Sequence, residues 1–338
     1  MGDSMGSTVE FLHHETIRRV YGRIDNLDQS KGLFTDDTAL RLVLYNVIIE
    51  KGRRITAYDL AEHWKRNVGP GDRYWITETF ISALLHLSQS PREAGFSNIP
   101  ADDAAMMIDP IGVVNCGNPR NAAVDAYDVG SICQSGPELE AAMAVAAAVA
   151  EAFRHDATPE TVLESACRYS SPEMRRRIEE TAKTAQLYGA PSDLYRAIYE
   201  TIAIDDGSSE IVKAWRAEEL KRRKMKLEDV SLGVSALEAV PVALAFFALS
   251  RGDPFETITW CVNYGRDCDT IAGIGGAIAG ALSSVSSIQR DFIEKINSAN
   301  NVSLQSIARG MIGPIINTIK EEEESTGEVR ELLSKIVE

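Results

Sequence analysis

The sequence predicts an all-α protein. Three observations support this class. A strand-like alternation of apolar and polar residues persists nowhere along the chain. The run Leu139 to Phe153 consists of strong helix formers throughout. Tandem repeats and low-complexity linkers are also absent, so we expect residues 1–338 to form a single domain.

The helices can be assigned in chain order from apolar spacing and from the breaks between them. Residues 12–31 are polar and irregular, and the adjacent His13 and His14 are expected on the surface, because sequence neighbours do not face the same way on a helix. The stretch Ser90 to Asp103 is dense in Pro, Gly, Ser and Asn and predicts a long surface connection. Helices are expected at 36–50, 56–68, 73–88, 139–153, 192–204 and 270–282, with two in 158–188 separated by Ser171-Pro172 and two in 287–338.

Composition excludes several classes of function. The net charge of −15 argues against nucleic-acid and anionic-membrane partners, which would require a basic face. The mixed basic run between Trp215 and Lys226 is interpreted as a solvated helix face. No apolar stretch predicts a membrane span, since Val230 to Leu249 contains Glu238 and Pro241. The chain carries no signal for its oligomeric state.

The cysteines indicate a reducing compartment. There are five, an odd number, and no CxxC pair, which suits a cytoplasmic protein without structural zinc. They are Cys116, Cys133, Cys167, Cys261 and Cys268. The start of the chain, Met-Gly-Asp-Ser, does not have the pattern of a secretory signal peptide, and the expected location is therefore the cytoplasm.

The stretch from Asn263 to Leu282 is an acidic helix start followed by an uncharged run of Ile, Ala and Gly. Asp267, Asp269 and Thr270 fall within four positions, and Thr270 is expected near the N-cap. Both carboxylates would benefit from the positive end of the helix dipole. This arrangement by itself requires no function, because acidic helix starts are common.

A second stretch repeats this chemistry. Thr35, Asp36, Asp37 and Thr38 precede an apolar helix. If the two helix starts face each other, four carboxylates meet, and their repulsion must be offset by a cation. Oxygen ligands without His or Cys indicate Mg²⁺, Mn²⁺ or Ca²⁺ rather than zinc. The proximity of the two stretches is an assumption at this point.

Several segments carry a resemblance to a known family. TDDTAL, VPVALAFFAL and GRDCDTIAGIGGAIAGAL occur in that order, after an opening GDSMGSTVE, and AAMMIDPIGVVNCGNP lies between. Together they resemble the ADP-ribosylglycohydrolase family, which includes the dinitrogenase reductase-activating glycohydrolases. The resemblance implies a compact orthogonal helical bundle with a central metal cleft. It also implies a hydrolase that acts on a small-molecule glycoside or on an ADP-ribosylated protein.

The resemblance further implies site residues. One or two Mg²⁺ or Mn²⁺ ions would be held by Thr35, Asp36, Asp37, Asp267, Asp269 and Thr270. Glu10 matches the family's glutamate beside the metal site, so Glu10, Asp36 and Asp269 are the expected catalytic residues. The expected reaction is cleavage of an N- or O-ribosyl bond by activated water.

Three positions depart from the family pattern where it lines the ADP-ribose pocket. Asp102 and Asp103 stand where relatives commonly have Ser-Asn-Gly, and Gln134 stands where they often have a Thr-His pair. Carboxylates oppose phosphate binding, so these substrate-binding candidates favour a smaller ribosyl compound or nucleoside as an alternative substrate. A second alternative is a non-catalytic binding or structural relative, which would predict broken metal motifs.

Overall fold

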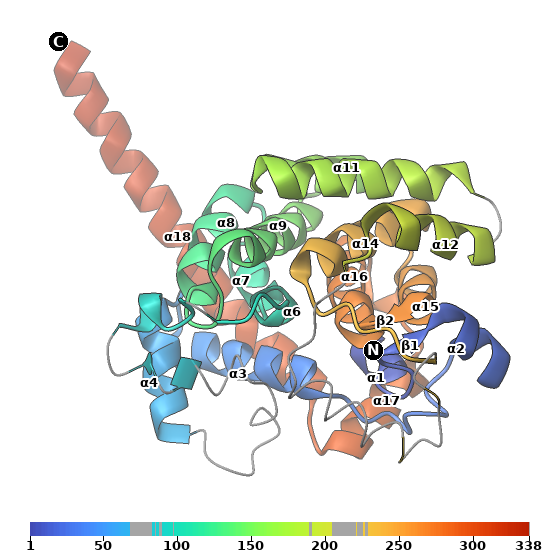
Figure 1. Ribbon diagram of the computed structural model, residues 1–338. Coiled ribbons are helices and arrows are strands. Elements are labelled where there is room, and N and C mark those ends of the chain that lie inside the picture. Colours follow the sequence, from blue (N-terminus) through green and yellow to red (C-terminus); the bar gives the residue numbers. More distant parts are fainter. Residues whose placement is uncertain are drawn as a thin grey trace.

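Helices make up most of the structure, which is a computed structural model (Figure 1). It describes residues 1–67, 83–84, 86–87, 90–96, 98–188, 191–204, 221, 226 and 229–337. The expected helices within 73–88 and 215–226 lie largely outside these residues. In the first half of the chain the elements are α1 (Gly2–Gly6), β1 (Leu12–His13), α2 (His14–Val20), α3 (Asp36–Lys51), α4 (Ala57–Asn67), η2 (Pro91–Glu93), α6 (Asp103–Met107), α7 (Asp109–Val114), α8 (Pro119–Gly130) and α9 (Gly136–Ala152). The second half contains α10 (Pro159–Arg168), α11 (Pro172–Leu187), α12 (Pro191–Ile202), α14 (Ala236–Leu249), α15 (Pro254–Tyr264), β2 (Gly265–Arg266), α16 (Cys268–Leu282), η4 (Val285–Ser287), α17 (Arg290–Asn300) and α18 (Leu304–Val337).

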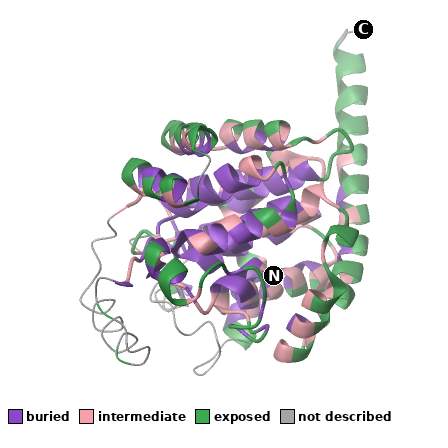
Figure 2. Ribbon diagram, turned by 90° about the vertical axis from the view of Figure 1, so that its right-hand side faces the viewer, coloured by how far each residue is buried: buried purple, intermediate pink, exposed green. Residues whose placement is uncertain are grey.

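The predicted all-α class is confirmed. Within the described residues, the only sheet is the antiparallel ribbon of β1 and β2, each two residues long. The core lies around α9, α14 and α16, whose residues are mostly buried (Figure 2). Helix α9 contacts α7, α8, α10, α14 and α16, because its alanine-rich surface lets neighbouring helices approach closely.

The helix ends follow local signals in the sequence. Ser171 accepts a hydrogen bond from the backbone of Met174 and caps α11, so the predicted break at Ser171-Pro172 is confirmed. Helix α3 ends at Gly52, whose left-handed conformation (φ 67°) suits a residue without a side chain. The two terminal helices are also confirmed, and the last part of α18 extends away from the body (Figure 1). No helix among the described residues is long and apolar enough to span a membrane.

The first helix packs against the start of α16 through its glycines. A Cβ on Gly6 would lie 2.5 Å from the Cα of Asp269, and one on Gly2 would collide with the carbonyl of Ala272. Only glycine permits this approach of two backbones. As a result, the opening segment of the chain lies directly against the acidic helix start.

Two expectations about exposure were wrong. His14 is buried, and it begins α2 rather than an irregular surface segment. The chain changes from strand to helix between His13 and His14, so both rings can face Tyr199, at centroid distances of 5.0 Å each. The connection of 90–103 is not a surface segment throughout either, since Asp102 and Asp103 at its end are buried.

Candidate functional site

The two acidic helix starts meet in the structure. The hydroxyl of Thr270 donates a 2.9 Å hydrogen bond to Oδ1 of Asp37, 233 residues away in the sequence. One detail of the prediction was wrong, because the N-cap of α16 is Asp267 and Thr270 lies in the first turn. With the N-cap at Asp267, both Asp269 and Thr270 lie in the first helical turn, where their side chains reach α3.

Asp3 holds the start of α3 in place. Its carboxylate accepts hydrogen bonds from the backbone N–H groups of Thr35 and Thr38, each at 3.0 Å, and from the Thr35 hydroxyl at 3.0 Å. The Thr35 hydroxyl also lies 3.3 Å from Oδ2 of Asp37. Asp3 is almost fully buried, and it therefore acts as an internal cap that orients Thr35, Asp36 and Asp37.

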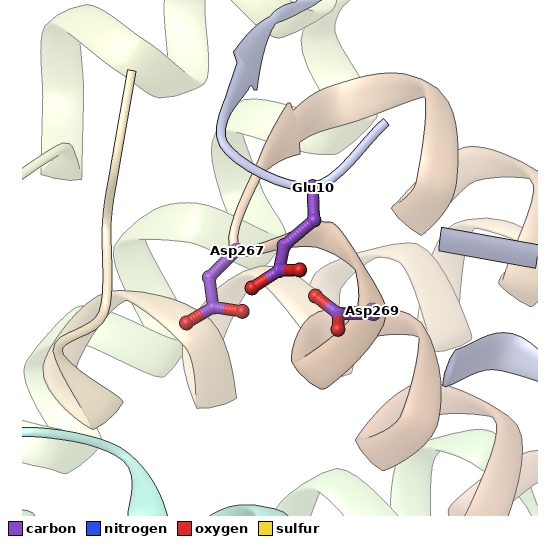
Figure 3. Close-up of side chains that lie close together, drawn as sticks. All are labelled: Glu10, Asp267 and Asp269. Carbon is purple, nitrogen blue, oxygen red and sulfur yellow. The ribbon is translucent and has the colours of Figure 1, made fainter. Parts of the chain in front are cut away.

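Glu10, Asp267 and Asp269 form the second part of the site. One carboxylate oxygen from each lies within 4.8 Å of the others, and the three carboxylates converge in Figure 3. Two unit charges at that separation repel by about 3 kcal/mol at an effective dielectric constant of about 20. The arrangement is costly unless protons or a cation neutralise part of the charge.

Burial and mutual repulsion raise the pKa of the site carboxyls. Desolvation and the charge of Asp3 raise the pKa of Asp36 to about 7 and that of Asp37 to about 8. Burial, together with the neighbouring carboxylates, places the pKa values of Asp267 and Asp269 well above the usual range. Without a cation, the site therefore holds protons near neutral pH.

A buried arginine that sequence reasoning missed stands behind this cluster. The guanidinium of Arg41 lies 2.9 Å from Asp109 and 3.9 Å from Asp37, and it packs against Gly273 of α16. Tyr45 donates a 2.9 Å hydrogen bond to the other oxygen of Asp109. Arg41 thus neutralises part of the charge from within the core and fixes α3 against α16.

The three candidates for substrate binding lie next to the acidic cluster. The charge of Asp102 raises the pKa of Asp267, and that of Asp103 raises the pKa of Asp36. All three candidate side chains are buried, and the amide of Gln134 donates to Oδ2 of Asp103 at 3.3 Å and to the carbonyl of Ile99 at 3.2 Å. Gln134 therefore supports Asp103 and the preceding loop.

A second buried ion pair, also missed, anchors the strand that leads to Asp267. Arg266 pairs with Glu238, which is fully buried, and donates further hydrogen bonds to Ser231 and the carbonyl of Ile204, each at 2.7 Å. Arg266 has φ 57°, a left-handed conformation that is unfavourable for a residue with a side chain. The ion pair stabilises this bend and thereby sets the direction of Asp267.

The donor set fits a hard divalent cation. Oδ1 of Asp269 and Oδ2 of Asp102 are buried and have no hydrogen-bond partner among the described residues. Unpaired buried carboxylate oxygens are costly, and a cation would satisfy them. The converging groups offer oxygen atoms only, which suits Mg²⁺, Mn²⁺ or Ca²⁺.

Comparisons with known proteins bear on the family and the fold of this chain. A family model described as ADP-ribosylglycohydrolase matches residues 1–322. The uncharacterised protein YegU of Escherichia coli is 24% identical over 329 residues, covering 92% of this chain and 93% of YegU. An uncharacterised protein of Archaeoglobus fulgidus is 29% identical over 306 residues, covering 83% of this chain and 84% of the relative. A solved structure described as an ADP-ribosylglycohydrolase-related protein complex has a TM-score of 0.62 at 21% identity and covers 92% of both chains. At that identity the structural likeness shows the fold alone.

Proposed function

Because this chain belongs to the ADP-ribosylglycohydrolase family of glycosidase-type hydrolases, we propose that it is a metal-dependent glycohydrolase that cleaves an N- or O-ribosyl bond. The observation that carries the proposal is the meeting of the two acidic helix starts, marked by the 2.9 Å hydrogen bond between Thr270 and Asp37. The unpaired, buried Oδ1 of Asp269 adds to it, because that oxygen requires a cation or a proton.

Six residues would hold one or two Mg²⁺ or Mn²⁺ ions. They are Thr35, Asp36, Asp37, Asp267, Asp269 and Thr270. The contact of Thr270 with Asp37 and the convergence of Asp267 and Asp269 support this set. A bound divalent cation supplies a Lewis acid that orients ribose hydroxyls and lowers the pKa of a nearby water.

Glu10 is the proposed general base. It lies within 4.8 Å of Asp267 and Asp269, at the edge of the carboxylate cluster, and it is only partly buried. From there its carboxylate can take a proton from the attacking water, a contribution of about 10²- to 10⁴-fold to the rate. Asp36 and Asp269 would bind and orient the ribose, and the negative cluster would favour the positive charge that develops on the sugar.

The substrate class most typical of the family is an ADP-ribosyl compound, either small or attached to a protein. A second candidate, a smaller ribosyl compound or nucleoside, is favoured by one specific observation. Asp102 is buried beside Asp267, and its Oδ2 atom has no hydrogen-bond donor among the residues that the structure describes. Burial and the neighbouring Asp103 raise the pKa of Asp102 well above its usual range. A diphosphate placed against this carboxyl therefore requires that it stay protonated, whereas an uncharged aglycone makes no such demand.

Isothermal titration of the Mg²⁺-loaded protein with ADP-ribose, ribose and a simple nucleoside tests the proposal, together with hydrolysis assays on the corresponding glycosides. We expect Mg²⁺-dependent hydrolysis that is abolished by Asp267→Ala and unchanged by Asp291→Ala, an exposed aspartate on α17. Tight binding of ADP-ribose would support the first substrate class, and a response to the nucleoside alone would support the second. Binding without hydrolysis of any glycoside would identify a non-catalytic relative and contradict the proposal.

A further inference from the structure

A cavity of about 990 Å³ lies outside the acidic cluster, between α2, α12 and the second half of α15. That volume is at the upper end of the range of about 300–1,000 Å³ that is typical of small-molecule sites. Four arginines line it: Arg18, Arg19, Arg23 and Arg196. Such a concentration of guanidinium groups is unexpected in a chain with a net charge of −15.

In this arginine cavity one of the four arginines, Arg19, is held in an ion pair with Asp229, whereas Arg23 and Arg196 are only weakly neutralised. Arg23 lies 3.6 Å from Glu256, and Arg196 lies 3.8 Å from Glu15, with at least 48% of each of these side chains exposed. Exposed ion pairs of this kind contribute about 0–1 kcal/mol, so a stronger anion can replace the carboxylates. Arg18 forms no ion pair within the described part of the chain.

Two aromatic side chains and one threonine form part of the cavity wall. Trp260 and Tyr195 line it with ring centroids 5.9 Å apart, and Trp260 stacks on Phe246 behind it. Thr259 also lines it, is only 4% exposed, and has a hydroxyl without a hydrogen-bond partner among the described residues. Its hydroxyl oxygen is fully enclosed, so Thr259 forms part of the cavity wall without offering that atom to a ligand.

We propose that the arginine cavity binds a mononucleotide. Guanidinium groups bind phosphate oxygens through paired N–H donors, and Arg18, Arg23 and Arg196 can do so, because only Arg19 among the four is held by Asp229. The planar base would lie against the rings of Trp260 and Tyr195. The overall charge of −15 opposes a long polyanion, so a free nucleotide fits better than a nucleic acid.

The β1–β2 ribbon connects the arginine cavity to the acidic cluster. In the β1–β2 ribbon, His13 pairs with Gly265 and Leu12 pairs with Arg266. His14 and Asn263, which line the cavity, lie close in sequence to the pair of His13 and Gly265. Glu10 and Asp267 lie close in sequence to the pair of Leu12 and Arg266. The arginine cavity and the acidic cluster therefore lie at opposite ends of one short ribbon. The binding proposal stands independently of the proposed hydrolase activity.

The test is isothermal titration with ATP, AMP and adenosine in excess EDTA, which keeps divalent cations out of the acidic cluster. We expect ATP to bind more tightly than AMP, and adenosine to bind most weakly. Arg18→Gln should weaken ATP binding about tenfold, which corresponds to about 1.4 kcal/mol. Because Arg18 is exposed, this variant should keep the wild-type melting temperature. Trp260→Phe should remove most of any ATP-induced change in tryptophan fluorescence.

Two control variants locate the bound nucleotide. Arg309→Gln alters an exposed arginine of α18 that does not line the cavity, and it should leave ATP binding unchanged. Asp269→Asn should also leave it unchanged, since the acidic cluster is separate. The proposal is overturned if ATP does not bind, or if Asp269→Asn weakens binding while Arg18→Gln does not. Either result leaves the hydrolase proposal standing.

Discussion

Replacing Glu238 with glutamine is the most direct test of how the strand before Asp267 is held. Glu238 is fully buried and accepts hydrogen bonds from Arg266 at 3.0 Å, from Tyr264 at 3.0 Å and from the backbone of Ile204 at 2.8 Å. The variant removes the carboxylate charge and leaves the guanidinium of Arg266 in the interior. Breaking a buried pair in this way costs about 3–5 kcal/mol, a large share of a total stability of about 5–15 kcal/mol.

Urea denaturation of the metal-free protein measures this cost. The double variant Glu238→Gln with Arg266→Met should be more stable than Glu238→Gln alone, because the uncompensated cation is gone. The control is Glu331→Gln, which breaks the exposed pair with Lys335 on α18 and should cost less than about 1 kcal/mol. A cost below about 1 kcal/mol for Glu238→Gln, or a double variant no more stable than Glu238→Gln, would refute the reasoning.

Three further predictions concern the site and its surroundings. Mg²⁺ or Mn²⁺ at about 100 times its dissociation constant should stabilise the protein by about 2.7 kcal/mol in thermal unfolding. Asp269→Asn should remove most of this gain. A melting temperature that the cation leaves unchanged would contradict a cation site. Gly6→Ala should cost about 1–3 kcal/mol and weaken the Mg²⁺ response, because the new Cβ would lie 2.5 Å from the Cα of Asp269, whereas Gly313→Ala has open space and should be neutral or stabilising. Burial and the neighbouring His13 lower the pKa of His14 from 6.5 to about 4, so the unfolded chain binds more protons below pH 6.5 and stability falls as the pH is lowered from 6.5 to 4. At pH 5 the loss of unfolding free energy due to His14 is up to about 2 kcal/mol. The difference between the urea midpoints at pH 7 and pH 5 should therefore be smaller in His14→Gln than in the wild type.

Much of the fold could be predicted because local signals and packing agree. Proline and a capping serine divide α10 from α11 at Ser171-Pro172, and the alanine-rich run of α9 becomes the centre of the core. The exact start of α16 could not be predicted, because Asp267, Asp269 and Thr270 are all suitable N-cap residues. Only contact with α3 decides which of them lies in the helix.

The types of residue in the candidate site could be predicted, but the residues that hold them in position could not. The two acidic stretches are visible in the sequence, while their meeting rests on a contact over 233 residues that no periodicity contains. Sequence reasoning missed Arg41, Glu238 and Arg266, because the surrounding helix or motif already accounts for a charged residue at each position. Their roles depend on partners supplied by other elements, such as Asp109 for Arg41.

The β1–β2 ribbon joins the segment that carries Glu10 to the segment that carries Asp267, so each segment helps to position the other. Residues 2–6 can pack on α16 only through glycine, and Glu10 lies in the turn two residues before β1 begins at Leu12. Because β1 pairs with β2 and Arg266 holds the end of β2 in a left-handed conformation, the backbone before Asp267 is tied to the backbone after Glu10. The distance between these two carboxylates is therefore set by backbone pairing rather than by their own side chains.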